Sequence, residues 1–246
     1  MNKEFLYGIL HQAKEIGVKE IGLFLLGEPF LVDALPEYVH YAKHEVGIEY
    51  VFVTTNGVLC TPDRLKPIID AGLDSIKFSM NAGTKQRYLE MHGVDRFDEV
   101  MTNIAWLHKH KPDNLKSCVS AIFIEEHKED LEELRQLVLR YVDEFYYLPL
   151  YNHAGHLSGD VVGNPGRLEN MVPPIPCWGL FNSAKISWDG WLTACYFDHD
   201  SSFEIADLNK VTLLEAWNHP KFTNLRRCHL TNILEDSLCA KCLGLK

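Results

Sequence analysis

The sequence predicts an α/β protein in which a partial β/α barrel is followed by a small C-terminal domain. Within the first 150 residues, helical periodicity alternates with short apolar runs of the kind found in buried strands. Such alternation is typical of a parallel sheet with helical crossovers. Further along the chain a hairpin signal and a group of cysteines indicate a second, smaller unit.

The first region is expected to alternate regularly between strand and helix. Asp33 and Thr61 are the expected N-caps of its second and third helices. Apolar spacing predicts helices over residues 5–16, 33–46, 61–71, 95–110 and 127–140. Apolar runs predict strands over residues 19–26, 48–55, 74–80, 116–124 and 144–150.

Glycine and proline enrichment over residues 152–176 predicts a linker between a first domain, 1–151, and a second domain, 177–246. Within the second domain, Asp189-Gly190 separates two apolar runs, which predicts a β-hairpin with a type I′ turn. Short helices are expected over residues 212–217 and 219–227.

The charge balance narrows the range of partners. The 246 residues contain 24 Lys and Arg against 34 Asp and Glu, a formal net charge of −10. An acidic chain is poorly suited to nucleic acid or to an anionic membrane surface. We also see no apolar run long enough to span a bilayer and no signal peptide, so we expect a cytoplasmic protein.

Four of the seven cysteines are candidate metal ligands. Cys177 precedes the hairpin and Cys195 follows it, while Cys239 and Cys242 form a Cys-x-x-Cys pair. Four thiolates suit zinc or an iron–sulfur cluster, and the single Cys-x-x-Cys pair favours the cluster. The alternative is four unrelated buried thiols. Cys60 and Cys118 are interpreted as core residues. Cys228 could compete as a ligand but is interpreted as a helix residue.

Polar groups lie at the ends of three successive predicted strands. They are Gly27-Glu28-Pro29, then Thr55 and Asn56, then Ser79 and Asn81. Because the carboxyl ends of parallel strands meet at one rim, these groups are candidate ligand contacts. Ordinary strand-ending turns are the alternative. Asp198, close after the hairpin, is interpreted as ending it rather than contacting a substrate.

With these motifs the sequence resembles the radical S-adenosylmethionine (SAM) superfamily, particularly members with a C-terminal SPASM or Twitch auxiliary-cluster domain. The resemblance implies that Gly27, Glu28 and Pro29 bind the methionine amino group of SAM. It also implies that Thr55 and Asn56 belong to a cofactor-binding strand end, and that Ser79 and Asn81 contact the ribose.

The auxiliary-domain pattern of Cys, Gly, Cys and Cys-x-x-Cys matches Cys177, Gly190, Cys195, Cys239 and Cys242. The resemblance therefore implies that these four cysteines bind an auxiliary 4Fe–4S cluster. It is closest to the one-cluster Twitch form of aminocyclitol dehydrogenases.

One departure from the family is large. The defining Cys-x3-Cys-x2-Cys loop is absent, and the chain opens in the helix that should follow it. We therefore expect a barrel lacking its first strand, with residues 19–26 at an unprotected sheet edge. We interpret the chain as N-terminally incomplete, and the alternative is a natural protein that has lost this site.

The resemblance implies an oxidoreductase. In such enzymes a 5′-deoxyadenosyl radical abstracts hydrogen from a small-molecule or peptide substrate, and the auxiliary cluster accepts an electron. An electron donor such as a flavodoxin or ferredoxin is implied. We expect that these 246 residues alone do not cleave SAM. The alternative is a non-enzymatic protein that uses the C-terminal cysteines to hold iron–sulfur or zinc structurally.

Overall fold

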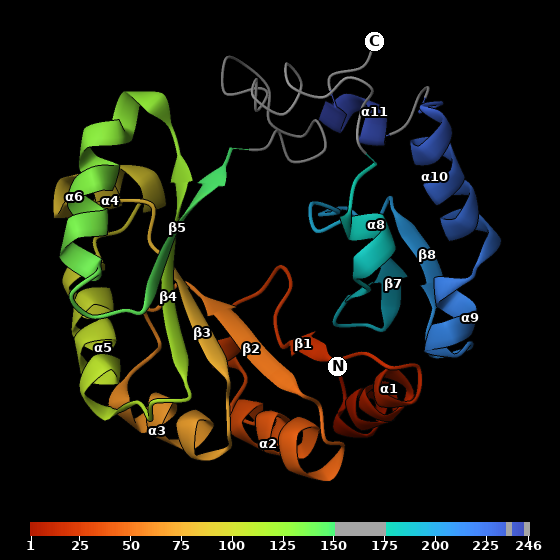
Figure 1. Cartoon of the computed structure of the whole chain (residues 1–246), viewed down its shortest axis with the longest axis horizontal. Helices are drawn as coiled ribbons and strands as arrows, with labels where there is room; N and C mark the ends of the chain where they lie inside the picture. The colour runs from red at the N-terminus through yellow and green to blue at the C-terminus, as the bar shows by residue number, and fades with distance from the viewer. Residues whose placement is uncertain (151–175, 235–237, 244–246) are drawn as a thin grey trace. The chain divides into compact units, whose positions relative to one another are not determined.

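The computed structural model describes residues 1–150, 176–234 and 238–243 (Figure 1). The chain divides into two compact units, residues 17–149 and residues 1–16 together with 150–246. The first helix, α1 (Lys3–Glu15), thus belongs to the same unit as the C-terminal region. The predicted linker lies outside the described residues except at its last position, and the predicted domain boundaries stay a prediction.

The larger unit is built on a five-stranded parallel sheet whose strand order follows the sequence. This arrangement confirms the predicted α/β partial barrel. The strands are β1 (Glu20–Gly22), β2 (Tyr50–Thr55), β3 (Ser75–Ser79), β4 (Lys116–Phe123) and β5 (Glu144–Pro149).

Strand β1 forms one edge of this sheet, as predicted, but it is shorter than the expected run over residues 19–26. The Leu23 N–H still donates to the Phe52 carbonyl (3.0 Å). The Phe24 ring then packs edge-to-face on the Phe52 ring, with centroids 5.5 Å apart. The apolar residues after Gly22 therefore form a packed loop instead of a longer strand.

Helices connect the strands, and Figure 1 shows α2, α3, α5 and α6 against one face of the sheet. The buried side chains of β2, Val51, Val53 and Thr55, alternate along that strand. The helices are α2 (Leu35–His40), which continues as the π-helical turn η2 (Tyr41–Glu45), α3 (Pro62–Asp70), α4 (Lys85–His92), α5 (Phe97–His110) and α6 (Lys128–Val138). Single turns η1 (Pro29–Leu31) and η3 (Glu125–His127) precede α2 and α6.

Two local expectations were wrong. Asp33 is not an N-cap, because α2 begins after Ala34 and the Asp33 carboxylate instead pairs with Arg64 (3.2 Å). Helix α4 was not predicted at all. It buries Tyr88 but no regular apolar stripe, so its sequence carries no helical periodicity, and the Thr84 side chain caps its first turn.

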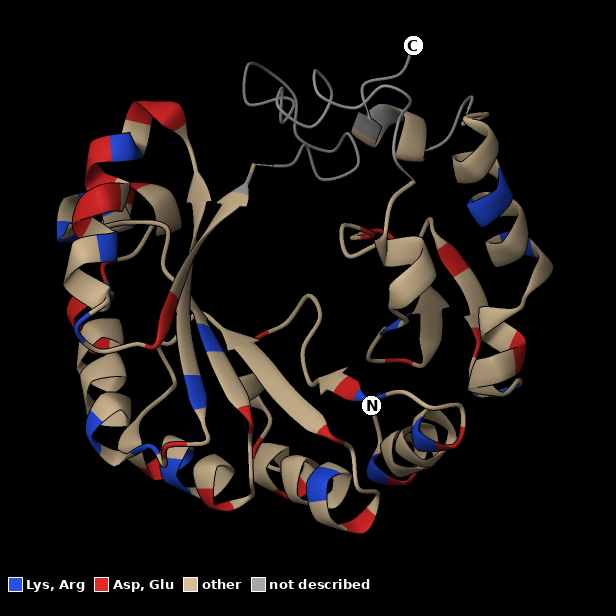
Figure 2. Ribbon diagram, viewed as in Figure 1, with Lys and Arg blue, Asp and Glu red and all other residues tan. Residues whose placement is uncertain are grey.

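Acidic and basic residues are interspersed over these helices (Figure 2). Glu129 and Asp130 lie in the first turn of α6, and His108, Lys109 and His110 lie in the last turn of α5. These positions oppose the partial charges of the helix ends, so we read them as helix-stabilising groups.

The smaller unit contains a three-stranded antiparallel sheet of β6 (Lys185–Ile186), β7 (Trp191–Thr193) and β8 (Glu204–Asp207). The predicted hairpin is therefore present, followed by a strand that the sequence did not reveal. Its helices are α8 (Gly179–Asn182), α9 (Leu213–Trp217), α10 (Pro220–Thr231) and α11 (Leu238–Leu243). Helix α1 joins this unit through the Gln12 side chain, which accepts from the Leu213 N–H at the start of α9 (2.7 Å).

The hairpin turn differs from the predicted type I′ form. Gly190 has a left-handed backbone (φ 96°), whereas Asp189 does not, so the two residues that type I′ requires at positive φ are not both present. The Gly190 N–H donates to the Ser187 carbonyl (3.0 Å), and the Ser187 N–H donates to Trp191 (2.9 Å). The connection is thus a longer turn centred on Trp188 and Asp189 and closed by the glycine.

None of the described helices combines the length and the apolar character that crossing a membrane requires.

Aspartates just before two strands repeat one arrangement in the parallel sheet. Asp74 precedes β3 and accepts a hydrogen bond from the Val51 N–H of β2 (2.7 Å). Asp143 precedes β5 and accepts from the Ser117 N–H of β4 (2.7 Å), from its hydroxyl (2.9 Å) and from Lys111. Burial raises the pKa of Asp143, but these hydrogen bonds outweigh it, so the pKa lies below its ordinary value.

We predict that Asp143→Asn lowers the free energy of unfolding by about 1–2 kcal/mol at pH 7, allowing for the partial exposure of the carboxylate. A carboxyl with a depressed folded pKa stabilises the protein above its unfolded pKa and loses that effect as pH falls through the folded value. Urea titrations should therefore show the difference shrinking from about pH 4 downward. Asp113→Asn, at an exposed loop position, is the control. A difference that does not change with pH would contradict the assignment.

Candidate functional site

The Glu28 carboxylate links the first two predicted motifs directly. Its Oε1 accepts hydrogen bonds from the Thr55 hydroxyl (2.7 Å) and the Phe30 N–H (3.1 Å). Its Oε2 accepts from the Asn56 N–H (2.8 Å). The loop after β1 is thereby fastened to the end of β2. The sequence placed Glu28 and Thr55 at one rim, but it did not reveal that they bond to each other.

Hydrogen bonds from within the larger unit stabilise the turn that follows β2. The Gly57 N–H donates to the Thr55 hydroxyl (3.0 Å), and the buried Asn103 amide of α5 donates to the Gly57 carbonyl (2.9 Å). Gly57 has φ 82°, and a Cβ there would meet Phe78 at 2.8 Å and Val100 at 2.9 Å. Glycine is therefore required at this position for both backbone and packing reasons.

The third motif joins β3 to β4. Ser79 is the last residue of β3, and Asn81 adopts a left-handed backbone (φ 61°). The Asn81 Oδ1 accepts a hydrogen bond from the Ile122 N–H in β4 (2.9 Å). Its amide N–H groups are the part of this side chain left to donate to a ligand. Among the described residues, no hydrogen bond connects Ser79 or Asn81 to Glu28.

Two of the predicted metal-binding cysteines, Cys195 and Cys239, are influenced electrostatically by the others. Burial raises the pKa of Cys239 to about 12, helped by the charges of Cys195, Cys177, Cys242 and Cys228. Burial also raises the pKa of Cys195, and the charges of Cys242 and Cys177 add to this. Groups coupled in this way must lie near each other. Cys177 before α8, Cys195 after β7 and the α11 pair are thus brought together.

A hydrogen-bond donor and a nearby positive charge oppose the effect of burial at the Cys195 sulfur. The Phe197 N–H donates to the Cys195 Sγ (3.3 Å), and the charge of Lys185 favours the Cys195 thiolate. Lys185 is itself buried, which lowers its pKa to about 8 against the opposing influence of Cys177 and Cys195. An N–H donor and a cation beside clustered thiols favour an anionic, thiolate-ligated group.

Among the described residues, no three His, Cys, Asp or Glu side chains stand close enough to hold a single metal ion. A 4Fe–4S cluster sets a different requirement, because each of its four thiolates binds its own iron. The donor set of four thiols with a neighbouring cation fits that group. The residues that would hold it are Cys177, Cys195, Cys239 and Cys242.

The remaining cysteines behave differently. Cys60 and Cys118 are buried in the larger unit, as expected of core residues. Cys228 lies in α10, as interpreted, but with Cys239 it also packs against a small core of Leu234 and Ala240. The sequence left Cys228 open as a competing ligand, and the structure adds that it packs against the same small core as Cys239.

Asp198 has a structural role. Its buried carboxylate accepts hydrogen bonds from the Thr193 hydroxyl (2.6 Å) and from the Phe203 N–H (3.1 Å). These contacts hold the segment between β7 and β8, and they support the interpretation that Asp198 ends the hairpin.

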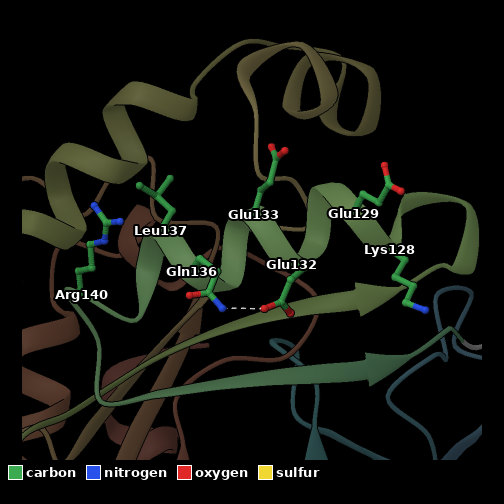
Figure 3. Close-up of a pocket in the computed structure, with 7 residues that line it drawn as sticks. All are labelled: Lys128, Glu129, Glu132, Glu133, Gln136, Leu137 and Arg140. Atoms are coloured by element: carbon green, nitrogen blue, oxygen red, sulfur yellow. Dashed lines mark hydrogen bonds between the residues drawn. The ribbon is translucent and has the colours of Figure 1, made fainter.

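A surface groove on helix α6 carries none of the predicted residues. Figure 3 shows its side chains projecting from successive turns, with the Gln136 amide donating to Glu132 (2.7 Å). The Tyr147 hydroxyl of β5 also donates to Glu132 (3.2 Å). Charges that bond within the protein in this way are typical of a solvated helix face. The groove encloses about 580 Å³ and is lined by Lys128, Glu129, Glu132, Glu133, Gln136, Leu137 and Arg140.

The fold and the site define an α/β protein. Polar residues lie at the carboxyl ends of its parallel strands, and the four predicted metal-binding cysteines gather in a second, smaller unit. Residues 1–138 match the family model of the Radical SAM superfamily, and residues 177–243 match SPASM, an iron–sulfur cluster-binding domain. The chain belongs to the radical SAM superfamily. Radical SAM and SPASM domains imply 4Fe–4S clusters and SAM binding, which confirms the expected cofactors.

Relatives of known sequence are matched over part of their length. The chain is 40% identical over 86 residues to the GTP 3′,8-cyclase of Chlorobaculum tepidum, covering 35% of this chain and 25% of that protein. It is 27% identical over 177 residues to the uncharacterized protein MJ0804 of Methanocaldococcus jannaschii, covering 69% of this chain and 58% of that one. The chain thus spans a quarter to little more than half of these relatives.

Solved structures share the fold. BtrN in complex with AdoMet and 2-DOIA has a TM-score of 0.64 at 17% identity, covering 98% of this chain and 79% of that one. SuiB of Streptococcus suis, bound to the precursor peptide SuiA, has a TM-score of 0.74 at 16% identity, covering 91% and 59%. The enzyme anSMEcpe with bound AdoMet has a TM-score of 0.69 at 12% identity, covering 99% and 80%.

We predict that Glu28→Ala lowers the free energy of unfolding by about 1–3 kcal/mol, because three hydrogen bonds to one carboxylate are lost. Urea denaturation followed by circular dichroism measures the change. Glu45→Ala removes an exposed carboxylate from the same unit and serves as the control. Equal losses in the two variants would show that the Glu28 contacts do not hold the rim.

Proposed function

We propose that this chain belongs to a radical SAM/SPASM oxidoreductase, with Cys177, Cys195, Cys239 and Cys242 binding an auxiliary 4Fe–4S cluster. The observation that carries the proposal is that all four cysteines lie within residues 177–243, which match an iron–sulfur cluster-binding domain, and that the Phe197 N–H donates to the Cys195 sulfur. When bound, such a cluster supplies one-electron chemistry.

The rim residues would hold SAM. In this proposal Gly27, Glu28 and Pro29 contact the methionine amino group, and the loop is oriented by its bonds to Thr55 and Asn56. A carboxylate has more acceptor positions than those three hydrogen bonds use, so Glu28 can also accept from an ammonium.

The ribose contacts belong to the next strand end in this proposal. Ser79 and Asn81 face the ribose, and the Asn81 side chain is oriented by its bond to Ile122. Preorganised groups of this kind lower the entropic cost of positioning a cofactor.

The substrate and electron donor belong to the same proposal. BtrN was solved with 2-DOIA and SuiB with a precursor peptide, which supports a small-molecule or peptide substrate. The relative named GTP 3′,8-cyclase adds a nucleoside triphosphate to the substrates worth testing. A flavodoxin or ferredoxin is the proposed electron donor. A bound auxiliary centre would accept the electron that the substrate radical loses after a 5′-deoxyadenosyl radical has taken a hydrogen atom from the substrate, and the remaining proton would leave to a base or to solvent, which balances a two-electron oxidation.

We predict that Cys239→Ser lowers the iron and acid-labile sulfide bound per chain after anaerobic reconstitution by more than half, because one of four thiolate ligands is lost. Cys118→Ser, which changes a buried thiol of the other unit, should leave both values unchanged. Equal iron and sulfide in the wild type supports the cluster. One zinc per chain without sulfide would instead favour the structural metal-binding alternative.

We further predict that the 246-residue chain, reconstituted and reduced with dithionite, forms no 5′-deoxyadenosine from SAM. The physical reason is that the sequence contains no Cys-x3-Cys-x2-Cys set to hold a cluster with an open iron. Chromatography of the reaction mixture measures the product, and equilibrium dialysis with labelled SAM measures binding separately. Formation of 5′-deoxyadenosine above the level of a cluster-free control would overturn this part of the proposal.

A further inference from the structure

Lys185 is a buried cation in the thiol-rich unit. It begins β6, and only 2% of its surface is exposed. Its ammonium donates to the carbonyl oxygens of Gly179 and Ser183, the latter at 3.0 Å, and lies 4.8 Å from the centroid of the Tyr196 ring. These contacts hold the ammonium in one place, but none of them supplies a negative charge.

The charges that act on Lys185 come from sulfur. In the described part of the chain no carboxylate lies within ion-pair distance of its ammonium. The groups that favour its charged form are Cys177 and Cys195, while Arg226 opposes it. Burying an ammonium without a counter-charge is costly, so a position of this kind requires an anion nearby.

Gly179 shows how close the ammonium and a sulfur are. A Cβ at this glycine would lie 3.1 Å from the Lys185 Nζ and 3.7 Å from the Cys177 Sγ. Both atoms therefore face the same small space over the Gly179 backbone. The missing side chain leaves room for the ammonium beside the sulfur, and a methyl group there would displace the ammonium by a few tenths of an ångström.

From this placement we infer that Lys185 is the buried counter-charge of the auxiliary centre and raises its reduction potential. The inference rests on the proposed function, which places Cys177 and Cys195 among the cluster ligands. Four thiolates bring more negative charge than the iron–sulfur core neutralises, and one-electron reduction makes the centre more negative still. A fixed cation beside two ligand sulfurs therefore favours the reduced form, which suits a centre that accepts an electron from a substrate radical.

The test is the midpoint potential of the reconstituted full chain, measured by mediated titration with dithionite as the electron source. Lys185→Met keeps the length of the side chain and removes its charge. We expect the equilibrium constant for reduction to fall at least about tenfold, a shift of 59 mV to more negative potential for one electron. Lys185→Arg, which keeps the charge, should remain nearer the wild type. Lys210→Met removes an exposed charge from the same unit (side chain 76% exposed) and should not shift the potential.

Iron and sulfide are measured on every variant before titration. A Lys185→Met chain that is fully loaded and keeps the wild-type midpoint overturns the inference. If Lys185→Met binds no cluster, Lys185→Gln decides, because it removes the charge but keeps a donor for the Gly179 and Ser183 carbonyls: a more negative midpoint supports the inference, and an unchanged one overturns it. A wild-type chain without iron and sulfide contradicts the proposed function itself and removes the inference with it.

Discussion

Parallel pairing of β1 through β4 is the constraint on which the rest of the larger unit depends. In a parallel sheet with helical crossovers, every strand ends on the same side, so the loop after each strand arrives at one rim. Glu28, Thr55 and Asn81 are far apart in the sequence but follow successive strands of this sheet. Without that pairing none of the three predicted motifs would belong to a common site.

Side-chain hydrogen bonds connect neighbouring strands in addition to the backbone hydrogen bonds of the sheet. At the carboxyl ends of the strands, Glu28 bonds to the end of β2 and Asn81 bonds to β4. At the opposite ends, Asp74 and Asp143 each accept from the N–H of the neighbouring strand. Polar side chains at both ends thus connect adjacent strands, and those at the rim connect the loops that carry the candidate cofactor contacts.

The smaller unit holds several thiols and the Lys185 ammonium in a largely buried space. The sulfurs come from the segment before α8, from the residue after the β7 segment and from α11, and the Lys185 ammonium lies near the Cys177 sulfur. Burial alone disfavours thiolates and ammonium alike, so their proximity is mutually favourable. The chain belongs to the radical SAM superfamily and matches the SPASM domain, which binds an iron–sulfur cluster, and thiols are the ligands that such a cluster requires.

The sequence by itself determined the alternation of helix and strand, the hairpin and the four-cysteine pattern, because periodicity and spacing are local properties. It also placed Glu28, Thr55, Ser79 and Asn81 after successive strands. Helix α4 escaped prediction because it buries too few apolar residues to show a period.

Only the tertiary structure decided which groups touch. It showed that Glu28 bonds to Thr55 and Asn56, that Cys228 lies beside Cys239, and that Lys185 is buried near Cys177. Such contacts join residues far apart in the chain, and their distances follow from packing that no local pattern records.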